Sequence, residues 1–323
     1  MSVTLALAGD TMLGRGVAER AAADPHGLFS EGVRDAVAAA DLAVLNLECC
    51  VSDRGRRWDP AHKAFHFRAP PAAGDALAGL GVDCVTLANN HALDYGPDAL
   101  ADTLEHLDRA GVRSVGAGRT DAEAREPVVL EAGGLTLAIV GVTDHPADFA
   151  AAPGRPGVAH ADLRAGVPER LLDRVRELRA ACDAVLVTPH WGPNMTSEPP
   201  PYVRRAARAF LEAGATLVAG HSAHVFHGVA GPVLFDLGDF IDDYAVDGLL
   251  RNDLGLLFHV TLDARGPSRV DAIPLRLDFA RTRLADGPDR AWITGRLTEA
   301  CAPFGTEVTA TGDGRLTITP ASR

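Results

Sequence analysis

Short apolar runs alternate with amphipathic stretches along most of the chain, and this alternation is typical of a layered α/β protein. The apolar runs predict strands over residues 3–8, 42–46, 82–88, 135–142, 184–188, 216–219 and 233–237. The amphipathic stretches predict helices near residues 31–40, 72–80, 97–110, 167–181 and 202–213. This β-α-β order predicts a layered α/β fold with a largely parallel core sheet.

The pattern changes after residue 255. Residues 256–262 and 270–277 predict adjacent strands without a helix between them, and residues 306–309 and 316–319 predict a hairpin. A helix is expected near residues 290–302. We therefore expect one domain over residues 1–323, in which residues 255–323 add strands and a helix at the margin of the sheet. Residues 52–71 and 143–158 fit neither pattern, and long irregular segments often form binding loops.

Composition narrows the class of protein. The 323 residues carry a formal net charge of −12, and no basic stripe or zinc-finger spacing is present, so we expect no nucleic-acid partner. No run approaches eighteen apolar residues, so no membrane span is expected. The first ten residues lack the features of a secretory signal, and the five cysteines lack C-x-x-C spacing. These observations favour free thiols and a cytoplasmic location.

Six polar clusters each follow a predicted strand. Because the carboxyl ends of parallel strands meet at one edge of a sheet, we expect the clusters to converge. Asp, Glu, Asn and His are the residue types that hold divalent cations in mixed oxygen and nitrogen shells. The sequence therefore predicts a metalloenzyme. The clusters are Gly9-Asp10, Asn46-Leu47-Glu48, Asn89-Asn90-His91, His190-Trp191-Gly192, Gly220-His221-Ser222-Ala223-His224 and Gly238-Asp239.

Each cluster also has a structural explanation when it is considered alone. Asp10 can cap a helix, His190 can be a core histidine, and Asp239 can be loop charge. The sharpest local signal is the pair His221 and His224, two imidazoles three residues apart just after a strand. The metal-site interpretation rests on all six clusters together.

In this order the clusters resemble the CapA-like branch of the calcineurin-like metallophosphoesterase superfamily, over about residues 3–262. The resemblance implies a four-layer α/β/β/α sandwich with a dinuclear metal site at its strand ends. Asp10 and His224 look like ligands of one ion. The other ion would take Asn90, His190 and His221. The residues do not distinguish Mn, Zn, Fe, Ca or Mg, nor one ion from two.

Further roles follow from the same resemblance. Glu48 stands where the superfamily places a bridging carboxylate, and His91 matches the histidine that protonates or steadies a leaving group. The chain departs from the superfamily at Met12, where a histidine is usual. The spacing from His221 to His224 is also one residue longer than in the family pattern, so which imidazole binds which ion stays open.

The chemistry expected of such a site is also suggested by the resemblance. The superfamily usually cleaves phosphoesters, whereas CapA is linked to poly-γ-glutamate, an amide polymer, and similar proteins in ribosomal-peptide pathways include one assigned to Cα epimerisation. We expect a metal-dependent enzyme that acts on a peptide backbone, with a ribosomal precursor peptide among the candidate substrates. Epimerisation from L to D through a metal-stabilised enolate is placed ahead of amide hydrolysis. Phosphoester hydrolysis and a non-enzymatic assembly role follow.

Candidate catalytic and binding residues complete the hypothesis. His91 is the first candidate acid or base. The second is left open among four residues, Asp144, His145, Glu198 and Asp239. Lys63 and Arg68, in the long loop, are candidates for binding a substrate carboxylate, since Arg grips carboxylates bidentately, and Trp191 is a further candidate substrate contact.

Overall fold

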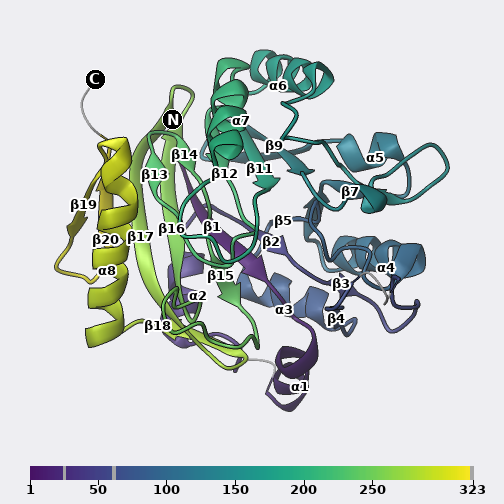
Figure 1. The fold of residues 1–323 in the computed structure, drawn as a ribbon, viewed down its shortest axis with the longest axis horizontal. Helices are drawn as coiled ribbons and strands as arrows, with labels where there is room; N and C mark the ends of the chain where they lie inside the picture. The colour runs from purple at the N-terminus through teal and green to yellow at the C-terminus, as the bar shows by residue number, and fades with distance from the viewer. Residues whose placement is uncertain (25–26, 60–62, 321–323) are drawn as a thin grey trace.

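Two β-sheets form the framework of the protein (Figure 1). The computed structural model describes residues 1–24, 27–59 and 63–320. The larger sheet contains, in spatial order, β19 (Glu307–Ala310), β20 (Leu316–Thr319), β17 (Gly266–Asp278), β16 (Leu254–Asp263), β1 (Val3–Thr11), β2 (Leu42–Leu47), β5 (Cys84–Thr86) and β6 (Arg113–Val115). Two strands join beside this path, β15 (Asp239–Ile241) against β1 and β18 (Arg281–Leu284) against β17.

The smaller sheet has six strands. Their order is β13 (Val229–Ala230), β14 (Val233–Leu234), β12 (Leu217–Ala219), β11 (Ala184–His190), β9 (Leu135–Thr143) and β8 (Val128–Ala132). Short ladders form elsewhere between β3 (Cys50–Val51) and β4 (Arg68–Ala69), and between β7 (Ala117–Gly118) and β10 (Gly157–Val158).

Helices connect the strands and cover the sheets (Figure 1). The α-helices are α1 (Arg15–Ala23), α2 (Glu31–Ala38), α3 (Ala73–Leu80), α4 (Gly96–Arg109), α5 (Asp121–Arg125), α6 (Glu169–Ala181), α7 (Pro201–Glu212) and α8 (Gly287–Cys301). Two 3₁₀ turns add Ala147–Phe149 and Ala302–Phe304. In the described part of the chain, none of these helices has the length and apolar character needed to cross a membrane.

The central strands are buried on both faces, which explains why they read as continuous apolar runs. Alternate side chains of a strand point to opposite faces. Leu5 and Leu7 of β1 therefore join the apolar cluster that also contains Leu137 of β9, whereas Ala6 belongs to the cluster that packs with α2, α3 and α4. A third cluster joins Val140 of β9 to α6 and α7. The two sheets thus share one apolar layer, and each has a second layer beneath its helices.

Most predicted elements are confirmed, and the chain has a mixed α/β fold. The expected parallel order holds for β1, β2, β5 and β6 and for β9, β11, β12 and β14. The remaining main-sheet pairings, apart from that of β15 with β1, are antiparallel. Consecutive strands such as β16 and β17 are joined by hairpins, whereas β1 with β16 and β17 with β20 pair strands that are far apart in the chain. The tail is also more central than expected: β16 pairs directly with β1, so strands from residues 254–319 form one whole side of the larger sheet.

Candidate metal centre

The first half of the centre lies at the carboxyl end of β1. Asp10 is opposite Asn46 of β2 and Asp239 of β15, and Glu48 follows β2. The strands β1 and β15 approach closely here, because a Cβ atom on Gly9 would lie 1.9 Å from the carbonyl oxygen of Gly238. Glycine at position 9 therefore permits the pairing that places Asp10 beside Asp239.

The smaller sheet supplies two histidines. His190 is the last residue of β11 and forms a bridge with His221, which follows β12. Their Nδ1 atoms are 2.8 Å apart, and the Nδ1 atom of His221 is 3.8 Å from Oδ1 of Asp10. One ligand atom from each of Asp10, His190 and His221 lies within 4.8 Å of the others, and all three residues are buried. We call these residues the first triad.

A second triad shares the same carboxylate. The Nδ1 atom of His224 lies 3.2 Å from Oδ2 of Asp10 and 2.8 Å from Oδ1 of Asp239. His224 adopts a left-handed backbone with φ of 61°, which is uncommon for a non-glycine residue and is frequent at functional sites. Asp236 holds this loop, because its carboxylate accepts hydrogen bonds from the amides of Ala223 and Gly238, each at 2.9 Å. Asp10 thus belongs to both triads, and the bridging role expected of Glu48 stays a prediction.

Several buried polar atoms at this centre have no hydrogen-bond partner among the described residues. They are both carboxylate oxygens of Glu48, Oδ1 of Asn90, Nε2 of His190 and Oδ2 of Asp239. Such groups are costly to bury unless they are paired or bind a metal. Burial and the nearby Asp10 carboxylate raise the pKa of Glu48 well above its usual range, and burial lowers the pKa of His190. The donor set therefore fits a divalent cation.

Two buried side-chain amides, those of Asn46 and Asn89, link Asp10 to the loop that follows β5. The side-chain amide of Asn46 donates to Asp10 at 2.7 Å, and that of Asn89 donates to Asn46 at 2.9 Å. The Oδ1 atom of Asn89 accepts from the backbone amides of His91 and Ala92, each at 3.0 Å. Both amides belong to the predicted polar clusters, although neither was predicted as a ligand or a catalytic residue. They fix the loop that carries Asn90 and His91.

An Asp-oriented imidazole stands beside Glu48. The Nδ1 atom of His91 lies 2.6 Å from Oδ2 of Asp94, and its Nε2 atom lies 3.7 Å from Oε1 of Glu48. Burial lowers the pKa of His91 to about 4, so the ring is neutral at pH 7. With Nδ1–H donated to the Asp94 carboxylate, Nε2 carries the lone pair and faces the cluster.

A second Asp-oriented imidazole lies beside the first triad. His145 pairs through Nδ1 with the carboxylate of Asp144, and its ring centroid is 5.1 Å from that of His190. The other oxygen of Asp144 accepts from the Tyr202 hydroxyl at 2.8 Å and from the Gly192 amide at 3.2 Å. The His145 side chain is 31% exposed, so a substrate can reach it. We therefore favour His145 among the four candidates for a second acid or base, because its ring is partly exposed and is oriented by Asp144.

The other predicted residues have different contacts from those expected. The Lys63 ammonium lies 3.1 Å from Asp94 and donates to the Asn90 carbonyl at 2.7 Å. The Arg68 guanidinium stacks on Tyr95 and donates to a loop carbonyl. Trp191 is 2% exposed and its indole donates to the Phe235 carbonyl at 2.8 Å. Glu198 pairs with Arg204 and is 75% exposed. Lys63, Arg68 and Trp191 are thus engaged in loop and core contacts, so their positions do not support the expected substrate contacts.

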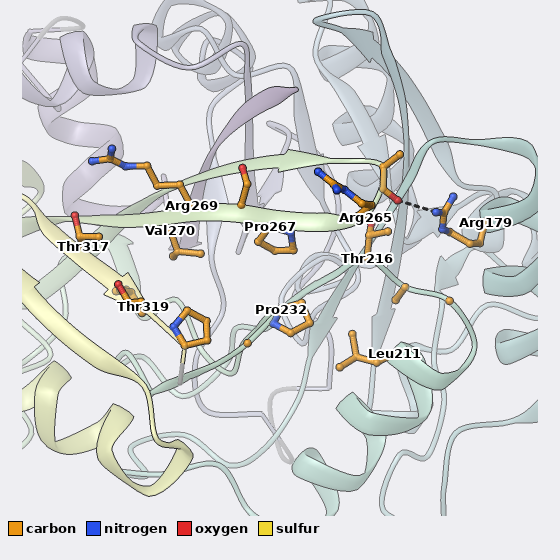
Figure 2. A pocket seen from close by; sticks show the side chains of 17 residues that line it. Arg179, Leu211, Thr216, Pro232, Arg265, Pro267, Arg269, Val270, Thr317 and Thr319 are labelled. Atoms are coloured by element: carbon orange, nitrogen blue, oxygen red, sulfur yellow. Dashed lines mark hydrogen bonds between the residues drawn. The ribbon is translucent and has the colours of Figure 1, made fainter. Parts of the chain in front are cut away.

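A hollow of about 730 Å³ lies at the amino ends of the parallel strands, away from the metal centre (Figure 2). It is lined in part by Thr216 and by residues of the turn between β16 and β17. Figure 2 shows Arg179 hydrogen-bonded to the carbonyl of Ala264, at 2.7 Å. Arg265 and Arg269 pair with neighbouring aspartates. Among its described lining residues there is no His, Cys, Asp or Glu, so the hollow offers no side-chain metal ligand of these types.

The described cysteines are free, and Cys49 beside Glu48 is buried. Burial raises the pKa of the Cys49 thiol to about 12. The thiol is therefore protonated near neutral pH in the absence of a metal, which makes it a poor nucleophile.

Residues 4–244 match the family model described as bacterial capsule synthesis protein PGA_cap. The chain belongs to this family. The matched range contains both triads, the Asp94–His91 pair and the Asp144–His145 pair. The whole candidate centre therefore lies within the part of the chain that the capsule synthesis family shares.

Two relatives of the capsule synthesis family are similar over most of this chain. A probable polyglutamine synthesis accessory protein of Mycobacterium tuberculosis is 30% identical, over 99% of this chain and 97% of its own length. The PGA biosynthesis protein CapA of Bacillus subtilis is 30% identical, over 84% of this chain and 71% of its own. A solved hypothetical protein from Thermus thermophilus aligns with a TM-score of 0.41 and 20% identity, over 87% of this chain and 96% of its own.

Proposed function

We propose that this chain is a metal-dependent enzyme that acts on the backbone of a peptide or peptide polymer. The observation that carries the proposal is the set of unpartnered buried donors around Asp10, flanked by two Asp-oriented imidazoles, His91 and His145. Membership of the capsule synthesis family, and relatives named for polyglutamine and PGA synthesis, support a role in the biosynthesis of a capsule or peptide polymer. The proposal includes membership of the metallophosphoesterase superfamily and its four-layer α/β/β/α arrangement. The apolar layer that the two sheets share supports this arrangement.

The metal ligands follow from the two triads. One ion would be held by Asp10, His190 and His221, and a second by Asp10, His224 and Asp239. The unpartnered oxygens of Glu48 and Asn90 are available to complete these shells. A bound divalent cation supplies a Lewis acid that polarises an amide carbonyl and lowers the pKa of water from about 15.7 towards about 7.

His91 and His145 carry the proton transfers. Asp94 holds His91 in the tautomer whose Nε2 accepts a proton, and its carboxylate stabilises the imidazolium that forms. Asp144 orients His145 through the same kind of contact, and its carboxylate would stabilise a protonated ring that gives its proton back as the acid. The two rings are carried by different sheets, His91 after β5 and His145 after β9. A peptide held between them would be met by a base on one side and an acid on the other.

Two reactions use this arrangement. Exchange of a Cα proton, with epimerisation from L to D, is our first candidate because inversion needs an acid and a base on opposite faces. Amide hydrolysis is the second candidate, and the carboxylate that both triads share favours it, since paired ions can clamp an attacking and a leaving atom.

One experiment separates these reactions. The Mn²⁺-loaded protein is incubated in deuterated water with a set of blocked peptides, including γ-glutamyl peptides, and the products are weighed. Epimerisation adds one dalton to an intact peptide, whereas hydrolysis splits the peptide. His91→Gln serves as the control and should retain the metal with strongly reduced turnover. A protein that binds no divalent cation, by elemental analysis after incubation with Mn²⁺ or Zn²⁺, would contradict the proposal.

A further inference from the structure

A second hollow, about 360 Å³, opens directly beside the metal centre. His91 and His224 line it, so it reaches one of the proposed proton-transfer groups and one of the proposed metal ligands. Phe65, Phe67 and Tyr244 contribute most of its aromatic wall, and Met195 adds a flexible apolar side chain. Its location makes it the place where the substrate's nearest side chain would lie. We call it the side pocket.

The aromatic wall is in contact with the reacting groups. The ring of Phe67 stacks on that of His91 with centroids 4.1 Å apart, and Phe67 stacks on Tyr244 at 5.5 Å. Tyr244 in turn meets the His224 ring edge-on at 5.3 Å. An apolar group in the side pocket would therefore be buried between rings that border both imidazoles.

The charges of the side pocket are already compensated. The guanidinium of Arg15 lies 4.8 Å from the Phe67 ring centroid, and its Nε atom donates to the Asp243 carboxylate at 3.0 Å. Asn252 uses both ends of its side chain, donating to Ala245 and accepting from Asp247. Among the described lining residues, no uncompensated cation is left to bind a glutamyl carboxylate.

The side chain of Asn194 is the exposed polar group of the side pocket. It makes no side-chain hydrogen bond to another described residue, so it is available to a backbone carbonyl or amide of a bound peptide. The hydroxyl of Tyr244 is buried, so Tyr244 contributes its ring to the wall. The pocket thus combines apolar walls with a polar group suited to fix a peptide backbone.

We propose that the side pocket determines substrate specificity and takes an apolar, preferentially aromatic, side chain of the peptide whose backbone reaches His91. This inference rests on the proposed function and narrows it, because it selects against a substrate that carries a carboxylate at this position. The carboxylate of a glutamyl side chain would lie against the rings of Phe65, Phe67 and Tyr244, and the described lining residues include no Arg or Lys without an anionic partner.

The test compares two neutral-backbone probes, N-acetyl-phenylalanine amide and N-acetyl-glutamate amide, by calorimetric titration of the Mn²⁺-loaded protein. We expect the aromatic probe to bind at least about tenfold more tightly, since aromatic pairs add to the burial of apolar area. Phe65→Asp should weaken the aromatic probe about tenfold, because the substitution places a charge in the wall. Phe65 is 63% exposed, so the variant should fold.

Phe279→Asp is the matched control. Phe279 is 70% exposed and does not line the side pocket, so its variant should bind both probes as the unmodified chain does. Equal binding of the two probes, or an unchanged affinity in Phe65→Asp, would overturn the inference. Metal content and peptide turnover are measured on the same samples. Turnover restricted to glutamyl peptides would contradict the proposed specificity of the side pocket but not the proposed function. Selective binding of the aromatic probe without any turnover would contradict the proposed function but not the specificity.

Discussion

The two ends of the parallel strands differ in how their polar groups are satisfied. At the amino ends, the hollow of Figure 2 is the larger, yet its arginines already have carbonyl or carboxylate partners. At the carboxyl ends, the space beside Asp10 is smaller, yet Glu48, Asn90, His190 and Asp239 keep buried atoms without partners. Buried oxygen and nitrogen atoms without partners, rather than the volume of a cavity, therefore distinguish the end of the strands at which we propose the metal centre.

The strongest test of this contrast removes one buried carboxylate from each end. Asp10→Asn should lower metal affinity by at least about a hundredfold, because it removes the ligand that both triads share. Turnover should fall below detection. Asp271→Asn is the matched control, since Asp271 is also buried but pairs with Arg269 near the other hollow. Elemental analysis after dialysis measures the effect, and equal metal content in the two variants would end the contrast.

The next test separates proton transfer from metal binding. His91→Gln should lower turnover by about 10²–10⁴-fold, the usual contribution of one positioned acid or base. Its metal content should stay that of the unmodified chain, because His91 belongs to neither triad. Steady-state rates and elemental analysis on one preparation check both statements. Loss of the metal together with turnover would instead make His91 a ligand.

A smaller effect is expected from the amide network. Asn46→Ala removes the hydrogen bond to Asp10 and the acceptor of Asn89, so both sides of the centre lose an orienting contact. Metal affinity should fall by about 10–100-fold, as for other residues that orient ligands. Competition with a fluorescent chelator measures the change. An unchanged affinity would show that strand pairing alone positions Asp10.

The smallest effect is expected at the amino ends. Arg179 joins the end of α6 to the turn after β16 through the carbonyl of Ala264. Arg179→Met should lower the free energy of unfolding by about 1–3 kcal/mol, the range for a hydrogen bond with a charged donor. Metal content and turnover should not change. Denaturant unfolding gives the first value, and altered turnover would assign this end a role that its contacts do not suggest.

Most of the longer strands and helices of the first 240 residues were predicted, because doubly buried strands and amphipathic helices have distinct periods. Helix α1 and strand β8 were not predicted. Short elements such as β15 were not predicted, since three residues carry no period. Its pairing with β1 depends on a close approach at Gly9 that only the folded chain shows. The place of β16 beside β1, rather than at the margin, likewise depends on which face each sheet offers the other.

The convergence of the six clusters followed from topology alone, but their internal order did not. The resemblance implied a bridging role for Glu48, which stays a prediction, and it did not indicate that Asp10 is common to both triads. Residues that work through other residues were also missed. Asn46 donates to Asp10 and Asn89 donates to Asn46 across strands, and such partners cannot be read from spacing along the chain. Asp94 instead orients His91 from three residues away. Trp191 lies next to His190 in the sequence and was a candidate substrate contact, but its side chain packs in the core.

The shared carboxylate of Asp10 also has a consequence for how the protein is made. The residues of the two triads extend from residue 10 to residue 239 and come from both sheets. A growing chain therefore has no complete binding shell until the second sheet has been synthesised and has docked. Binding of the ion would therefore be a late step of folding, and it would link the two sheets through their ligands. Without the ion, each sheet would still form, but the metal–ligand bonds that join the two sheets would be absent.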